Sequence, residues 1–138
     1  MTDDETPRWQ YRYENLIMSL ATLEEGVERL NADQLDQLGR DGLIQRFEIT
    51  FELAWKTLGD RLKGLGHKVK MSPAIVIREA FAADMIKEAD MWMQAMNARN
   101  DTSHLDDAVR ATSVVQQIAA SFLPMFQEFV QGLKGNAA

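Results

Sequence analysis

Apolar residues recur every three or four positions along almost the whole chain, and this spacing constrains the fold more than any other feature. The first such run puts six apolar side chains on one face of a helix: Tyr13, Leu16, Leu20, Leu23, Val27 and Leu30. Strand-like alternation is nearly absent. Only 3 prolines and 8 glycines interrupt 138 residues, so long helices are expected. The sequence therefore predicts an all-α protein.

The periodic segments predict an up-and-down bundle of three long and two short helices. Helices are expected at residues 9–30, at 43–65, from Ser72-Pro73 onward, at 89–99, and from Asp106 or Asp107 onward. The polar stretch 31–42 is predicted to be a connection with at most one short helical turn. Pro124 lies inside the last helical pattern and is expected to kink or divide that helix, because proline lacks the N–H that a helix needs.

Three tryptophans and several methionines add to the apolar surface of these helices. The fourth helix is expected to bury Met93 and Met96, with Trp92 beside them. The wide apolar helix faces, extended by Trp9, Trp55 and Trp92, point to a homodimer. A single helical domain over residues 1–138 is expected, with a core at about 9–133 and frayed ends.

Charge and composition narrow the possible functions. The net charge of −6 and the pI of about 4.9 repel phosphate backbones, so binding to RNA would need a local cluster of positive charge. Cysteine is absent, which excludes disulfides, thiolate zinc sites and cysteine nucleophiles. No apolar run is long enough to span a membrane, and the acidic start does not resemble a secretory signal. A cytoplasmic location is expected.

The stretch "NARNDTSH" at residues 97–104 is the candidate functional motif. On a regular helix Arg99 and His104 would point about 140° apart. Asn, Asp, Thr and Ser favour helix ends and turns, so a helix break here is expected to bring both side chains into one cleft. Arginine can hold a phosphate, and histidine can transfer protons near neutral pH. Alternatively, Arg99 is a salt-bridging helix end and His104 an ordinary hydrogen-bonding residue.

Three segments together resemble the nucleotidyltransferase substrate-binding protein family of the HEPN superfamily. They are "RFEITFELAWKTLGDRLKGLG", "SPAIVIREAFAADMI" and "MWMQAMNARNDTSH", and the resemblance covers residues 9–130. It implies a helical homodimer that works with a minimal nucleotidyltransferase, in many cases as the toxin of a toxin–antitoxin pair. Arg99 and His104 match the arginine and histidine of the family's metal-independent ribonuclease site, and Asn100 matches the polar residue beside that arginine.

The resemblance also shows one departure. In some systems the partner transfers AMP to a tyrosine two positions after the motif histidine, whereas this chain has Asp106 there. A non-catalytic module that holds a nucleotide or substrate at the dimer cleft, or a plain dimerising scaffold, therefore remains an alternative to the ribonuclease. No cofactor and no metal site are predicted. Glu52 and Lys56 have the spacing of an ordinary helical ion pair, Glu48 lies one turn before Glu52, and His67 is expected in a solvated turn.

Overall fold

The computed structural model describes residues 8–101 and 108–136, and all regular structure in these ranges is helical. Its elements are α1 (Arg8–Asn31), α2 (Gln37–Gly64), α3 (Pro73–Ala82), α4 (Ala89–Asp101), α5 (Ala108–Gln117), the π-helical turn η2 (Ile118–Phe122) and α6 (Leu123–Asn136). Since α5, η2 and α6 follow one another without a gap, they form one long helix. The predicted all-α bundle of three long and two short helices is confirmed.

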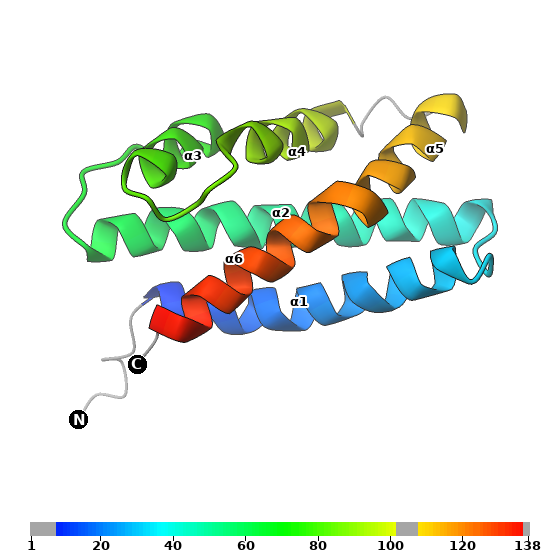
Figure 1. Cartoon of the computed structure of the whole chain (residues 1–138), viewed down its shortest axis with the longest axis horizontal. Helices are drawn as coiled ribbons and strands as arrows, with labels where there is room; N and C mark the ends of the chain where they lie inside the picture. The colour runs from blue at the N-terminus through cyan, green and yellow to red at the C-terminus, as the bar shows by residue number, and fades with distance from the viewer. Residues whose placement is uncertain (1–7, 102–107, 137–138) are drawn as a thin grey trace.

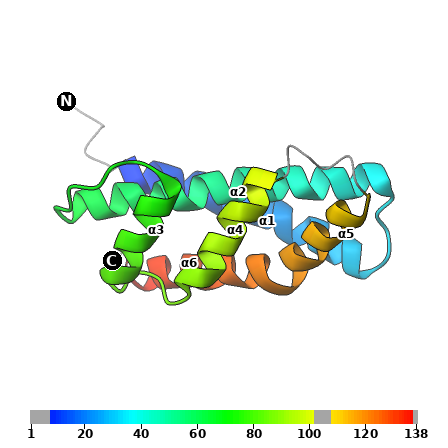
Figure 2. The same ribbon diagram turned by 90° about the horizontal axis from the view of Figure 1, so that it is seen from above.

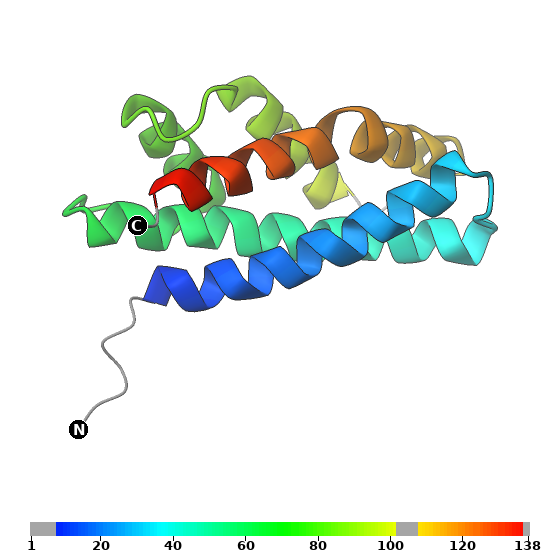
Figure 3. The same cartoon turned by 60° about the horizontal axis from the view of Figure 1, so that its bottom comes forward.

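The long helices α1 and α2 form an antiparallel hairpin, and the last helix crosses over this pair (Figure 1, Figure 3). The short helices α3 and α4 lie against α2, and α4 also contacts η2 (Figure 2). Gly26 of α1 is buried against the side chain of Leu43 on α2. A Cβ atom there would lie 2.7 Å from Cδ1 of Leu43, too close for a real side chain. The hairpin is the frame on which the other helices pack.

Aromatic side chains from three helices form the centre of the core. Phe47 of α2 is fully buried and stacks on Phe122, with a ring separation of 5.3 Å. It also lies 6.4 Å from the ring of Phe51 and 6.2 Å from that of Phe126. Trp92 of α4 meets Phe126 edge-on at 6.0 Å. These contacts attach α4 and the last helix to the middle of α2.

The second helix begins earlier than predicted. It starts at Gln37, six residues before the expected start at Leu43, so most of the predicted connection is helical. Asp36 is the cause, since its side chain accepts a hydrogen bond from the Gly39 N–H at 2.8 Å and caps the first turn. The predicted connection rested on the polar character of residues 31–42, and Gly39 and Gly42 lie within the first two turns of the helix that replaces it.

Replacing Asp36 by alanine is expected to lower the free energy of unfolding by about 1 kcal/mol, because the first turn loses its capping acceptor. Urea denaturation followed by circular dichroism measures this change. Asp41→Ala is the matched control, as it removes an exposed carboxylate from inside the same helix. An equal loss in both variants would show that the cap contributes nothing specific.

Pro124 distorts the last helix as predicted. The preceding residues widen into the π turn η2, where the Leu123 N–H donates to the Ile118 carbonyl. A proline in a regular helix would leave the carbonyl four residues earlier without a donor and would clash with it. The wider turn accommodates the ring, and the helix continues to Asn136.

The fourth helix buries a different side chain from the one predicted. Trp92 is 2% exposed and belongs to the core, whereas Met93 and Met96 are half-buried. Trp9 and Trp55 are also buried within the chain, at 7% and 6% exposure. The tryptophans therefore no longer argue for a dimer. No helix within residues 8–101 and 108–136 is both long and apolar enough to cross a bilayer.

A buried polar contact joins the start of α1 to the end of α2. The guanidinium of Arg12 lies 3.3 Å from the carboxylate of Asp60, which is 7% exposed. The hydroxyl of Tyr13, the residue that follows Arg12, is buried and has no hydrogen-bond partner in the described part of the chain. Burial raises the pKa of Tyr13 above its ordinary value of 10.0, because the tyrosinate would lose its hydration.

This raised pKa predicts an alkaline loss of stability. The folded chain holds the Tyr13 proton more tightly than the unfolded chain, so the free energy of unfolding falls once the pH rises above 10.0. Tyr13→Phe is expected to reduce this fall and to leave stability at pH 7 equal or higher, since the hydroxyl forms no bond to lose. Urea melts at pH 7 and pH 10.5 test both points. Tyr11→Phe, at a 48% exposed position, should keep the alkaline fall.

Candidate functional site

Arg99 lies in the last turn of α4, on the side of that helix that packs toward α2. Trp92, Ala95 and Ala98 are the buried residues of α4 and set its position, and the Trp92 ring packs against Phe126 and Phe129 of α6. The Arg99 side chain is 38% exposed, and its Nη2 atom lies 3.8 Å from Oε1 of Glu52 on α2. The helix continues through Arg99 and Asn100 to Asp101, the last described residue before position 108.

Glu52 is held in place by a second contact. Its Oε2 atom accepts a hydrogen bond of 2.7 Å from the indole N–H of Trp55, one turn further along α2. Trp55 is buried, which fixes the position of the donor. Glu52 does not form the ion pair with Lys56 that its spacing suggested, since the Lys56 ammonium lies 5.9 Å from the centre of the Trp55 ring. One carboxylate oxygen thus bonds Trp55 while the other faces Arg99.

The ion pair between Glu52 and Arg99 is loose. Its 3.8 Å separation is longer than a hydrogen bond, and both side chains are about one-third exposed. Ion pairs of this kind contribute at most about 1 kcal/mol. A phosphate can accept two hydrogen bonds from one guanidinium, which is a closer interaction than this single 3.8 Å contact with Glu52.

The other residues of the predicted motif fall in different places. Asn100 is exposed and follows Arg99 on α4, so the two are neighbours but point in directions about 100° apart. His104 and Asp106 lie outside the described residues. The proximity of Arg99 and His104 remains a prediction.

Two further basic side chains, Arg46 and the sequence candidate His67, take ordinary structural positions. Arg46 turns toward α1, where its Nη1 atom donates to the Thr22 carbonyl at 2.8 Å and lies 3.3 Å from Oε1 of Glu25. His67 is exposed in the segment that follows α2. Within residues 8–101 and 108–136, no group of three or more side chains has an arrangement that could hold a metal ion.

The contact among Glu52, Trp55 and Arg99 was not predicted from the sequence. The spacing of Glu52 and Trp55 by three residues is a signal for a contact along one helix. The approach of Arg99 comes from the packing of α4 on α2, which no local pattern shows. A cavity of about 360 Å³ at the other end of α4, between α2 and α6, was not predicted either.

The comparison with protein families decides the assignment. A family model described as nucleotidyltransferase substrate binding protein like matches residues 11–135. The chain belongs to this family. Among proteins with curated descriptions, none matches the sequence significantly.

A solved structure supports the family assignment and the fold. The crystal structure of a protein from Thermus thermophilus matches with a TM-score of 0.70 and 28% sequence identity. The match covers 88% of this chain and 97% of the Thermus chain. The family's helical bundle is therefore the scaffold on which Arg99 and Glu52 are placed.

Proposed function

We propose that this family member is the HEPN-type partner of a minimal nucleotidyltransferase. In this proposal it is the toxin of a two-gene toxin–antitoxin module and cleaves RNA without a metal ion. The observation that carries the proposal is the partly exposed Arg99 side chain, whose guanidinium faces Glu52 at 3.8 Å across a loose ion pair on the surface of α2 and α4. The partnership with a nucleotidyltransferase rests on the description of the family.

The proposed reaction uses the ribose 2′-hydroxyl as the nucleophile. His104 takes the proton of this hydroxyl, its oxygen attacks the adjacent phosphorus, and the bond from phosphorus to the 5′-oxygen breaks. The products are a cyclic phosphate and a 5′-hydroxyl, to which a proton is returned. Arg99 stabilises the negative charge that grows on the phosphate oxygens, and Asn100 orients the phosphate or the histidine. A homodimer would bring two copies of Arg99 together and give the acidic chain a local positive charge.

A second candidate is a non-catalytic subunit that binds a nucleotide or substrate for the partner enzyme. The observation that favours it is the position of Glu52, whose negative charge faces the same guanidinium that would hold RNA. Together with the net charge of −6, this carboxylate weakens the attraction of a long polyanion more than that of a small ligand.

RNA cleavage by the purified chain in the presence of EDTA distinguishes the two. If the chain is a ribonuclease, we expect cleavage that survives chelation and yields cyclic phosphate ends. We also expect this cleavage to be lost in His104→Ala. The alternative outcome is a folded wild-type dimer that cleaves none of a varied set of RNAs but binds a mononucleotide in calorimetry. This result would favour the non-catalytic binding subunit over the ribonuclease. Cleavage that persists in His104→Ala would remove this histidine from the mechanism.

A further inference from the structure

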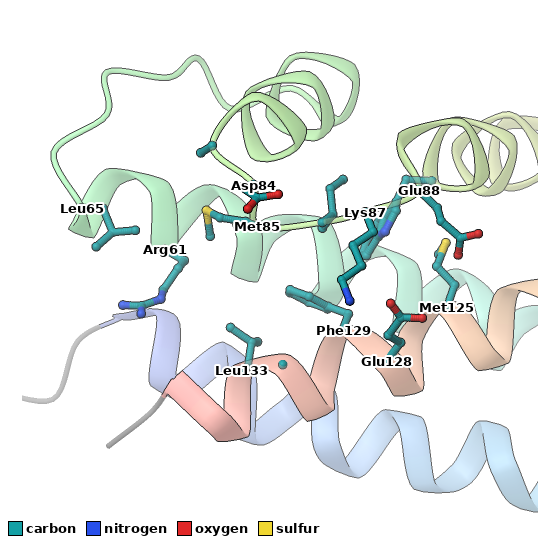
Figure 4. Close-up of a pocket in the computed structure, with 14 residues that line it drawn as sticks. Arg61, Leu65, Asp84, Met85, Lys87, Glu88, Met125, Glu128, Phe129 and Leu133 are labelled. Carbon is teal, nitrogen blue, oxygen red and sulfur yellow. The ribbon is translucent and has the colours of Figure 1, made fainter.

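The cavity of about 360 Å³ lies beside the first turns of α4, at the opposite end of this helix from Arg99. Figure 4 shows side chains from α2, the segment before α4, and α6 around it. Its apolar lining includes Met85, Trp92, Phe129 and Leu133. Leu65 also lines it and is 56% exposed. The volume is in the range of ligand-binding sites, and the floor is apolar.

Charged side chains of both signs surround this floor. Arg61 lies at one end and Glu88 at the other, with Lys87 and Glu128 between them (Figure 4). Arg61 is held against the ring of Trp9, with 4.9 Å between its guanidinium carbon and the ring centre. Its position is therefore restrained before anything binds.

This charge pattern disfavours a nucleotide. The lining holds two cations, Arg61 and Lys87, against three carboxylates, Asp84, Glu88 and Glu128. Phosphates would face a net negative lining. A protein segment suits the cavity better, because one apolar side chain can fill the floor while flanking residues of opposite charge meet the two ends.

We propose that the cavity is the docking site for an amphipathic segment of the partner nucleotidyltransferase. An apolar side chain of that segment sits between Met85, Trp92 and Phe129. A basic residue faces Glu88 and Glu128, and an acidic residue faces Arg61. The partner's identity rests on the proposed function, whereas the chemistry of the docking segment comes from the cavity itself.

The cavity and Arg99 lie on the same helix, so a partner docked in the cavity could affect RNA binding at Arg99. Trp92 and Arg99 are seven residues apart on α4, so they lie about 10 Å apart along the helix and within about 20° of the same direction. A partner segment in the cavity therefore reaches the surface where RNA would bind if it continues along α4 for about 10 Å. This arrangement lets the partner obstruct that surface in a chain that has Asp106 where a modifiable tyrosine stands in some relatives.

The test measures, by calorimetry, the binding of the full chain to the minimal nucleotidyltransferase of the proposed two-gene module. The double variant Glu88→Lys/Glu128→Lys is expected to weaken binding at least tenfold, and Leu65→Glu should act in the same direction. All three positions are exposed, so these variants are expected to fold. The matched control is Glu14→Lys/Glu28→Lys, which reverses two exposed charges on α1 away from the cavity and should bind like the wild type.

Other outcomes overturn the docking proposal in distinct ways. Unchanged binding in the cavity variants, with a stable wild-type complex, would place the partner elsewhere and leave the proposed function intact. If the cavity variants change the mass of the homo-oligomer and leave binding to the partner unchanged, the cavity would be assigned to a second copy of this chain. If the wild-type chain alone binds ATP and the cavity variants do not, the cavity would be assigned to a nucleotide. A wild-type chain that does not bind the enzyme would overturn the partnership itself, and docking with it.

Discussion

Replacing Arg99 by alanine is expected to lower the rate of RNA cleavage at least 100-fold. In the proposed reaction the guanidinium stabilises the charge that develops on the phosphate in the transition state, and loss of one such donor typically costs about 10²–10³ in kcat. Arg99→Lys is expected to fall between alanine and the wild type, because lysine keeps the charge but loses the planar pair of donors. Single-turnover cleavage of a fluorescent RNA in EDTA measures all three rates.

The matched control for this experiment is Arg46→Ala. The Arg46 side chain is 39% exposed, compared with 38% for Arg99, and each arginine lies within 4 Å of one glutamate. Arg46 faces α1 and is expected to have little effect on the cleavage rate. Equal rates for Arg99→Ala and the wild type would show that this guanidinium does not contact the scissile phosphate.

Replacing Phe47 by alanine is expected to lower the free energy of unfolding by about 3–5 kcal/mol. The side chain is fully buried and contacts the rings of Phe51, Phe122 and Phe126, so its removal opens a cavity between α2 and the last helix. Because small domains have only about 5–15 kcal/mol of stability, this variant is expected to be partly unfolded at 37 °C. Urea denaturation at 15 °C measures the change.

Two further variants keep this prediction testable if Phe47→Ala does not fold. Phe47→Leu retains most of the apolar volume and should show a smaller loss in the same direction. Leu38→Ala, at a position of α2 that is 79% exposed, should change the free energy of unfolding by less than about 0.5 kcal/mol. A loss of similar size at Leu38 and Phe47 would contradict the assignment of the core.

The boundaries of the helices show where local patterns were sufficient. The spacing of apolar residues predicted α1 to within one residue at each end. It failed at the start of α2, because residues 31–42 are largely polar and the capping role of Asp36 becomes visible only once the turn has formed. The spacing also predicted Met93 and Met96 as the buried residues of α4, whereas Trp92 is the one in the core. The face that a short helix buries depends on the helices that pack against it.

For the candidate site, the sequence by itself determined the residue types and the family pattern. Arg99 and Asn100, next to each other in a polar stretch at the end of a predicted helix, were visible because charge and local helix preference are properties of neighbouring residues. The ion pair of Arg99 with Glu52, the bond from Trp55 that orients Glu52, and the cavity at the other end of α4 were decided by the tertiary structure. The ion pair and the cavity join residues that are far apart in the sequence or come from several helices. Their positions follow from helix packing, which depends on the shapes of all the packed faces together.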